Sequence, residues 1–330
     1  CRINTYGNSF TQCHQVSDYE TWQEYLAGHL GEPIQNFGMG GFGVYQAYRR
    51  LLRREKVDKN SKYVILYMWG NDYVRSVFRC RYASYYKTWN DYGGTMFHGN
   101  FWSNIEMDVK TGKLVEKENR ISSKKEIYNM CDPEFMYDNL KDDLMLQLHL
   151  LSNDLVNYDI DSKGLKKLAK IFGLPEVDFR STEKMKLTAR ALRDKYSFKA
   201  TKYILDKTRE FCDQHGKELL LVHFDHINVF YEMAIGKKRY DQEMIDFIKA
   251  KGFNFFDMNE IHLEDFKKFN LSLDEYMKRY FNGHYNPTGN HFFAYAIKDK
   301  IVDWIDPKPI TYQQTDDKPI RYEGYLQMQK

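Results

Sequence analysis

Residues 1–72 alternate short apolar segments with amphipathic ones, and this alternation limits how the chain can fold more than any other feature. The apolar segments have the length of strands and the amphipathic ones have helical periodicity. Strands joined by helices favour right-handed parallel units in one sheet, so we expect an α/β fold. We expect strands at 2–6, 34–37 and 63–69, and helices at 17–30 and 44–55.

The same pattern returns after residue 200 and ends in a helix whose first turn begins at Pro287. We expect helices at 200–215 and 241–251, and strands at 218–224 and 253–257. The alternation therefore predicts one large discontinuous domain interrupted by an insertion. The expected organisation is 1–72 and 201–305 for the α/β domain, 73–200 for the insertion and 306–330 for a tail that wraps the surface or is disordered.

The insertion is crowded with aromatic and cationic side chains in its first part, and Thr111-Gly112-Lys113 predicts a hairpin turn further on. Because the insertion leaves the sheet directly after Asn71, it starts on the side where ligands bind. It is either a lid or substrate wall, or a subdomain that packs its aromatic rings internally. Its cations form either a clamp for an anionic substrate or a solvated face. They include Arg75, Arg79, Arg81 and Lys87.

Polar and glycine-rich motifs stand where three of the expected strands end, and a fourth precedes the last helix. Carboxyl ends of parallel strands meet at one edge of an open sheet, so we expect Ser9 to face a crevice. A serine there acts as a nucleophile only if a base takes its proton and preorganised donors receive the oxyanion. The motifs are Gly7-Asn8-Ser9, Asn36-Phe37-Gly38-Met39-Gly40-Gly41, Gly70-Asn71-Asp72 and Gly283-His284-Tyr285-Asn286-Pro287-Thr288-Gly289-Asn290.

In this order the four motifs resemble the blocks of the SGNH (GDSL-like) hydrolase family. The resemblance implies a flavodoxin-like three-layer α/β/α sandwich with a large insertion after the third strand. It implies that Ser9 is the nucleophile and His284 the base. The backbone N-H groups of Ser9 and Gly41 and the side chain of Asn71 would form the oxyanion hole. Such a site requires no metal and no organic cofactor.

The sequence departs from the family at the residues that precede the histidine. Family members carry an aspartate two or three positions before it, whereas this chain has Asn282 and Phe281 there. Three interpretations follow. Asn282 orients His284 or the site is a Ser-His dyad; an acid comes from elsewhere, such as Asp257 or Asp225; or the site is weakened.

Two motifs allow other functions. Gly38-Met39-Gly40-Gly41-Phe42-Gly43 satisfies the dinucleotide fingerprint, but that fingerprint normally follows the first strand and expects an acid at the end of the next strand. We therefore favour the oxyanion interpretation. His223-Phe224-Asp225-His226 has metal-binding residue types, but no third and fourth ligands stand at a recognisable spacing, which favours a polar edge of the crevice.

Composition excludes some classes of function. Lys and Arg number 49 against 46 Asp and Glu, so the overall charge of +3 does not suggest nucleic-acid binding. No apolar run is long enough to span a bilayer. The five cysteines lack metal-type spacing, so a disulfide framework is not expected and one pair stays open. The chain begins inside its first strand, so we expect upstream residues and leave the compartment and the oligomeric state open.

The expected activity is serine-dependent hydrolysis of a small ester, and an O-acetyl group on a carbohydrate is the first choice of substrate because aromatic residues make up 16% of the chain. An O-acyltransferase acting on a sugar uses the same acyl-enzyme. A carbohydrate-binding relic of the fold is the third alternative. Candidate substrate contacts are Asp72, Tyr73, Tyr82, Tyr85, Tyr86 and Trp89.

Overall fold

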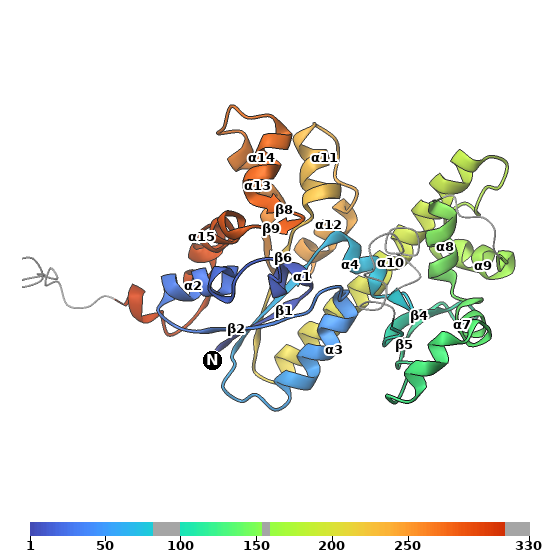
Figure 1. Cartoon of the computed structure of the whole chain (residues 1–330), viewed down its shortest axis with the longest axis horizontal. Helices are drawn as coiled ribbons and strands as arrows, with labels where there is room; N and C mark the ends of the chain where they lie inside the picture. Colours follow the sequence, from blue (N-terminus) through green and yellow to red (C-terminus); the bar gives the residue numbers. More distant parts are fainter. Residues whose placement is uncertain (82–99, 154–158, 314–330) are drawn as a thin grey trace, which may run out of the picture.

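The computed structural model describes residues 1–81, 100–153 and 159–313. Its centre is a five-stranded parallel sheet in the order β2-β1-β3-β6-β7, flanked by helices on both faces (Figure 1). The predicted α/β class with a central parallel sheet is confirmed. The strands are β1 (Ile3–Gly7), β2 (Ile34–Gly38), β3 (Tyr63–Met68), β6 (Glu218–His223) and β7 (Asn254–Asp257).

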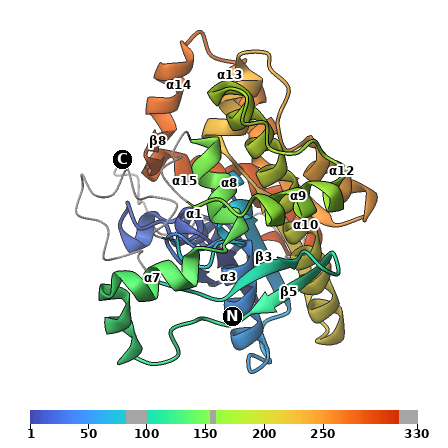
Figure 2. The same ribbon diagram turned by 90° about the vertical axis from the view of Figure 1, so that its right-hand side faces the viewer.

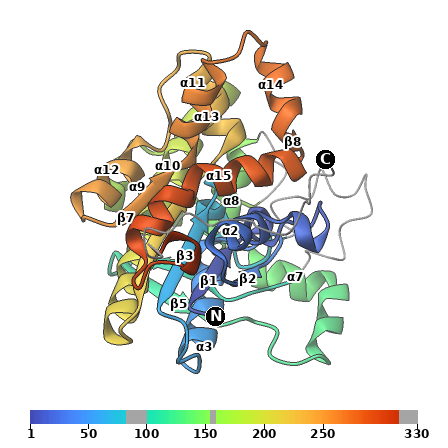
Figure 3. The ribbon, with the colours of Figure 1, turned by 90° about the vertical axis from the view of Figure 1, so that its left-hand side faces the viewer.

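Both faces of the sheet are buried. Consecutive side chains of β3 point to opposite faces, and each set packs into a different core cluster. Val64 and Leu66 belong to one core cluster, and Ile65 and Tyr67 belong to the other. All six residues of the strand are buried, as expected for a central parallel strand covered on both faces. The first cluster contains side chains of α3 (Val44–Glu55), α10 (Thr182–Gln214) and α12 (Gln242–Ala250). The second contains side chains of α2 (Trp22–Leu30), α13 (Met258–Phe266) and α15 (Pro287–Trp304). Figure 3 shows α2 and α15 in front of the sheet.

The order of the strands places a crevice at the carboxyl ends of β1 and β3. The chain first moves from β1 to β2 at one edge, then returns past β1 to β3 and continues to β6 and β7. This reversal between β1 and β3 is the topological switch point at which open α/β sheets bind ligands. Two short helices begin there, α1 (Ser9–Gln12) after β1 and α4 (Gly70–Arg75) after β3.

The insertion forms a lobe beside the sheet (Figure 2). The predicted hairpin is present, with Gly112 at φ 69° in the turn between β4 and β5. The buried side chains of the lobe, such as Ile105 and Met145, belong to the same core cluster as Val64 of the sheet. The lobe contains β4 (Asn104–Asp108), β5 (Lys113–Lys117), η3 (Glu126–Cys131), α7 (Pro133–Leu140), α8 (Leu144–Ser152) and α9 (Ser162–Phe172).

Helix α10 corrects the expected boundary at residue 200. It runs without a break over Thr182–Gln214, so the boundary falls in its middle and the predicted helix at 200–215 is only its second half. The helix contacts α8 of the lobe and α3 beside the sheet. Its thirty-three residues include no Gly and no Pro, which explains why it does not stop. The lobe and the sheet are therefore joined by one rigid element.

The remaining helices connect the sheet to the histidine motif and to the C-terminal segment. The predicted helix at 17–30 is divided at Thr21, whose side chain caps α2. The described start of the tail covers α2, where the Thr311 hydroxyl donates to the carbonyl of His29 at 2.9 Å. These elements are η1 (Asp18–Glu20), η4 (His226–Phe230), α11 (Tyr231–Ala234), α14 (Leu273–Tyr280), β8 (Phe281–Asn282), β9 (His284–Tyr285) and η5 (Ile310–Tyr312).

Two further expectations concern membrane-spanning helices and disulfides. Within the ranges that the structure describes, no helix is long and apolar enough to cross a membrane. All five cysteines fall inside those ranges, and no disulfide joins any two of them.

Candidate active site

Ser9 is the first residue of α1, immediately beyond the end of β1. Asn8 caps this helix, since its side-chain oxygen accepts a hydrogen bond from the N-H of Phe10 at 2.8 Å. A Cβ at Gly7 would lie 2.3 Å from the hydroxyl of Thr11 and 2.8 Å from the carbonyl of Tyr67, so only glycine fits. The sharp turn that results presents Ser9 at the switch point, with 7% of its surface exposed.

His284 meets Ser9 across the crevice, as predicted. Its Nε2 lies 2.6 Å from Oγ of Ser9. The backbone N-H of His284 donates to the side-chain oxygen of Gln15 at 2.8 Å, which holds β9 against the segment after α1. The imidazole packs against Phe10 and His14, with ring centroids 4.7 and 4.8 Å apart. Packing against Phe10 and His14 therefore holds the ring, and the Gln15 contact holds the backbone that carries it.

Asn282 does not orient His284, which corrects one of the predicted roles. Its side chain is exposed and makes no hydrogen bond with any residue of the described ranges. Nδ1 of His284 is buried and likewise has no partner there. The physical reason is the turn at Gly283, with φ 76°, which leaves Asn282 facing solvent while Phe10 and His14 take the space beside the ring.

The two acids proposed as substitutes for the missing aspartate are occupied elsewhere. Asp225 caps η4 by accepting hydrogen bonds from the N-H groups of Ile227 and Asn228 at 3.1 and 2.9 Å. Asp257 forms an ion pair with Arg239. Neither carboxylate bonds to His284, so the described residues bring together a Ser-His pair and no acid.

We expect Asn282→Asp to leave kcat for a small acetyl ester unchanged within about twofold, because the side chain at this position does not reach the base. Steady-state kinetics of the two proteins at neutral pH make the comparison. A rise of about a hundredfold or more would show that residue 282 does contact the ring, since a carboxylate in a serine-protease triad is worth about ten-thousandfold.

The environment of His284 favours its neutral form. Burial lowers the pKa of its imidazole, and together with smaller contributions from repulsion by His14 and Arg75 it brings this pKa to about 4. Neutral imidazole is the form that takes a proton from a serine. The imidazole is therefore unprotonated at neutral pH, and within the described ranges its Nδ1 has no carboxylate partner.

The acid limb of the pH profile should report this shift. Protonation of His284 as the pH falls through its pKa removes the base, so we expect kcat/KM for a neutral ester to stay level from neutral pH down to a pH of about 5 and to fall below it. A pH series on wild type and on His14→Gln measures the limb, and the variant should move it slightly upward. An acid limb centred near the ordinary histidine pKa of about 6.5 would contradict the buried, uncompensated base.

The three hydrogen-bond donors proposed for an oxyanion hole lie in the turns that follow β1, β2 and β3. The backbone N-H of Ser9 lies at the start of α1, Gly41 lies in the turn after β2, and the exposed side chain of Asn71 lies in the first turn of α4. None of these donors has an acceptor among the described residues. Gly41 has φ 84°, in the left-handed region that favours glycine.

Asp72 has a different role from the predicted substrate contact. It is only 1% exposed, and it accepts hydrogen bonds from the side chain of Asn8 and from the N-H of Trp69. Arg75 lies 3.1 Å from its other oxygen. Burial raises the pKa of Asp72 to about 7, and Arg75, Trp69 and Asn8 counteract part of this rise. Asp72 thus ties the turn after β3 to the residue that precedes Ser9.

The other predicted substrate contacts either lie in the core or fall outside the described residues. Tyr73 is 1% exposed and stacks on His223 at 5.9 Å, which places its ring in the core and corrects that expectation. Arg79 forms ion pairs with Glu106 and Asp142 inside the lobe, so it is no substrate clamp. Four of the proposed aromatic contacts and one cation lie outside the described residues: Tyr82, Tyr85, Tyr86, Trp89 and Lys87.

The glycine-rich turn lacks the free helix end that a dinucleotide needs. The N-H of Tyr45 at the start of α3 donates to the hydroxyl of Ser76 at 3.1 Å, and the N-H of Gly43 donates to the side chain of Gln46 at 3.0 Å. A Cβ at Gly43 would lie 2.6 Å from the backbone of Ser76, so α4 already occupies the place of a pyrophosphate. This favours the oxyanion interpretation.

The histidines of the segment after β6 do not converge on a metal. His223 approaches Asn259 at 3.1 Å, whereas the ring of His226 stacks on Phe281 at 4.9 Å. Across the described ranges, no group of three or more His, Cys, Asp or Glu side chains could hold a metal ion.

A scan against protein-family models finds no match, and a search of curated proteins finds none that matches the chain. The interpretation of the site therefore depends on its geometry and on the motifs that the sequence carries.

Proposed function

We propose that this protein is a serine esterase of the SGNH type. The observation that carries the proposal is the 2.6 Å approach of His284 Nε2 to Ser9 Oγ at the topological switch point of the sheet. A serine and a base at this distance are poised for proton transfer. The donors proposed at Ser9, Gly41 and Asn71 follow the carboxyl ends of β1, β2 and β3, which align at one edge of the sheet.

In the proposed reaction, His284 takes the proton of Ser9 as Oγ attacks the ester carbonyl. The carbonyl oxygen becomes an oxyanion that the three donors bind. The bond to the leaving oxygen then breaks, and His284 gives its proton to the departing alcohol. Water, deprotonated by the same imidazole, attacks the acyl-Ser9 ester, releases the carboxylic acid and restores the hydroxyl.

The proposed substrate is an O-acetyl group on a carbohydrate. The turn that carries Gly41 also carries Met39 and Phe42, and these side chains face Trp102 of the lobe across a cavity. Aromatic rings offer a flat apolar surface for the faces of sugar rings. This arrangement supports a glycan as the alcohol part of the ester.

A binding protein that has lost catalysis is the second candidate, because Nδ1 of His284 is buried without a partner in the described ranges. Labelling with a fluorophosphonate separates the two functions. This reagent reacts with an activated serine, so we expect labelling of the wild type and none of Ser9→Ala. Equal labelling of both proteins, or of neither, would contradict the esterase.

A further inference from the structure

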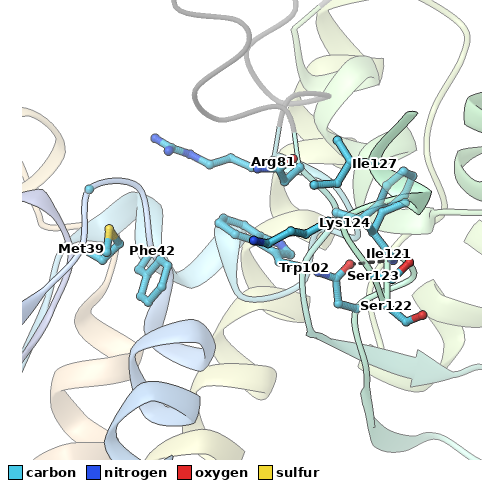
Figure 4. A pocket seen from close by; sticks show the side chains of 13 residues that line it. Met39, Phe42, Arg81, Trp102, Ile121, Ser122, Ser123, Lys124 and Ile127 are labelled. Atoms are coloured by element: carbon cyan, nitrogen blue, oxygen red, sulfur yellow. Dashed lines mark hydrogen bonds between the residues drawn. The ribbon is translucent and has the colours of Figure 1, made fainter. Parts of the chain in front are cut away.

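A long groove lies between the sheet domain and the lobe, beside the turn after β2 that carries Gly40 and Gly41. One cavity of 460 Å³ begins at Gly40, and a second of 810 Å³ runs along α3. Both are lined by Met39, Phe42, Trp102 and Asn119, so they form one continuous channel. In Figure 4, Met39 and Phe42 lie on one side of the opening and Trp102 with Lys124 on the other.

The groove is strongly cationic although the chain as a whole is nearly neutral. Among the residues that the structure describes, no Asp or Glu lines either cavity. Glu118 forms an ion pair with Arg49 at 2.6 Å. The overall charge of +3 does not account for this concentration of positive charge. The cationic lining residues are Arg49, Arg50, Arg53, Arg54, Arg81 and Lys124.

The arginines of α3 are placed to contact successive units of a polymer. Arg50, Arg53 and Arg54 are three and four positions apart, so they follow one face of the helix over about one turn of 5.4 Å. Arg50 and Arg54 lie over the ring of Phe37, at 5.9 and 5.1 Å from its centroid. None of these three forms an ion pair with a described residue, and they remain half-buried or exposed.

The end of the groove at Gly40 is also cationic. The guanidinium of Arg81 covers Gly41 so closely that a Cβ on this glycine would lie 1.5 Å from one of its nitrogens. Arg81 therefore stands at the donor of the proposed oxyanion hole and in the wall of the cavity. The indole of Trp102 is held by its N-H, which donates to the carbonyl of Phe78 at 2.6 Å. Charge and an aromatic surface thus meet in the wall of the cavity that begins at Gly40.

We propose that this groove binds an anionic polysaccharide whose sugar units carry carboxylates, and that the ester cleaved at Ser9 is an acyl group on that polymer. The identity of the cleaved bond rests on the proposed function; the binding of the polyanion does not. Arginine forks match carboxylates in geometry, and Phe42 and Trp102 supply surfaces for the sugar rings. Nucleic acids are also polyanions, but they carry no carboxylic ester that the proposed esterase could cleave.

Binding can be measured without turnover in the Ser9→Ala protein. The probes are a galacturonate oligosaccharide and a neutral cello-oligosaccharide of equal length, titrated at low salt. We expect the anionic probe to bind at least about tenfold more tightly, and its affinity to fall as salt is added because screening weakens exposed charge pairs. Equal affinity for the two probes, or tighter binding of single-stranded DNA of equal charge, would overturn the proposal.

A matched pair of triple variants locates the site. Arg50→Gln, Arg53→Gln and Arg54→Gln together should weaken galacturonate binding by about tenfold or more. The control combines Lys163→Gln, Lys167→Gln and Lys249→Gln, which remove the same charge from exposed positions on α9 and α12, and should change affinity by less than about twofold. Equal losses in both variants would show a nonspecific charge effect and contradict the groove. A wild-type protein that lacks esterase activity but binds the probes as expected would refute the proposed esterase activity and not the binding of the polyanion.

Discussion

Ser9→Ala is expected to lower kcat/KM for a small acetyl ester by about a thousandfold or more, because the proposed mechanism has no second nucleophile. The fold should be unaffected. The hydroxyl of Ser9 makes its one described side-chain hydrogen bond with His284, so its removal leaves the turns around β1 and β3 intact. The measurement is steady-state hydrolysis of p-nitrophenyl acetate together with the thermal midpoint of unfolding.

Ser162→Ala serves as the matched control, since Ser162 is an exposed serine at the start of α9. It should retain full activity. Hydrolysis by Ser9→Ala within about tenfold of wild type would remove Ser9 from the mechanism, whereas a large fall in its thermal midpoint would assign the residue to the fold.

Asn71→Ala is expected to lower kcat by about a hundredfold with a smaller change in KM, as for a donor that binds the oxyanion in the transition state. Its side chain is exposed at the end of β3 and makes no hydrogen bond with a described residue, so stability should stay the same. Kinetics over a range of ester concentrations separate kcat from KM.

The control for this variant is Asn60→Ala, which changes an exposed asparagine in the loop before β3. It should leave both parameters unchanged. If Asn71→Ala raised KM alone, the residue would be a ground-state contact of the substrate, and the oxyanion role would be refuted.

The sequence predicted the sheet and the meeting of Ser9 with His284, which are 275 positions apart. The sequence allowed that prediction because parallel strands align their carboxyl ends at one edge of the sheet. Motifs at strand ends therefore converge whatever their separation along the chain. The continuity of α10 was also accessible, since no Gly or Pro interrupts the segment, but the change in composition near residue 200 outweighed this signal.

The side chains that hold His284 could not be predicted from the residues next to it in the sequence. Its orientation depends on Phe10, His14 and Gln15, which come from the opposite end of the sequence. The spacing of Asn282 suggested an orienting contact, but the local turn directs this side chain to solvent. The contact between Asn8 and Asp72 was missed for the same kind of reason: it joins two strand ends that become neighbours only when β1 and β3 pair.

In our two proposals, the site and the groove belong to an enzyme that binds a charged polymer through many weak contacts and uses a histidine base without a carboxylate partner among the described residues. The neutral His284 lacks a carboxylate in the described ranges, so stabilisation of the transition state depends more on the oxyanion donors. The cation of Arg81 against Gly41 adds positive charge beside those donors. We therefore regard the turn at Gly41 as the point where substrate binding and catalysis meet.

The most direct test of the central claim is to trap the acyl-enzyme. Wild-type protein is mixed with excess p-nitrophenyl acetate, quenched with acid within the burst of nitrophenol release, digested and mapped by peptide mass. The account predicts one acetyl group, on Ser9, and its absence in Ser9→Ala. An acetyl group on another residue, or hydrolysis with no acetylation of Ser9, would contradict the proposal that Ser9 is the nucleophile.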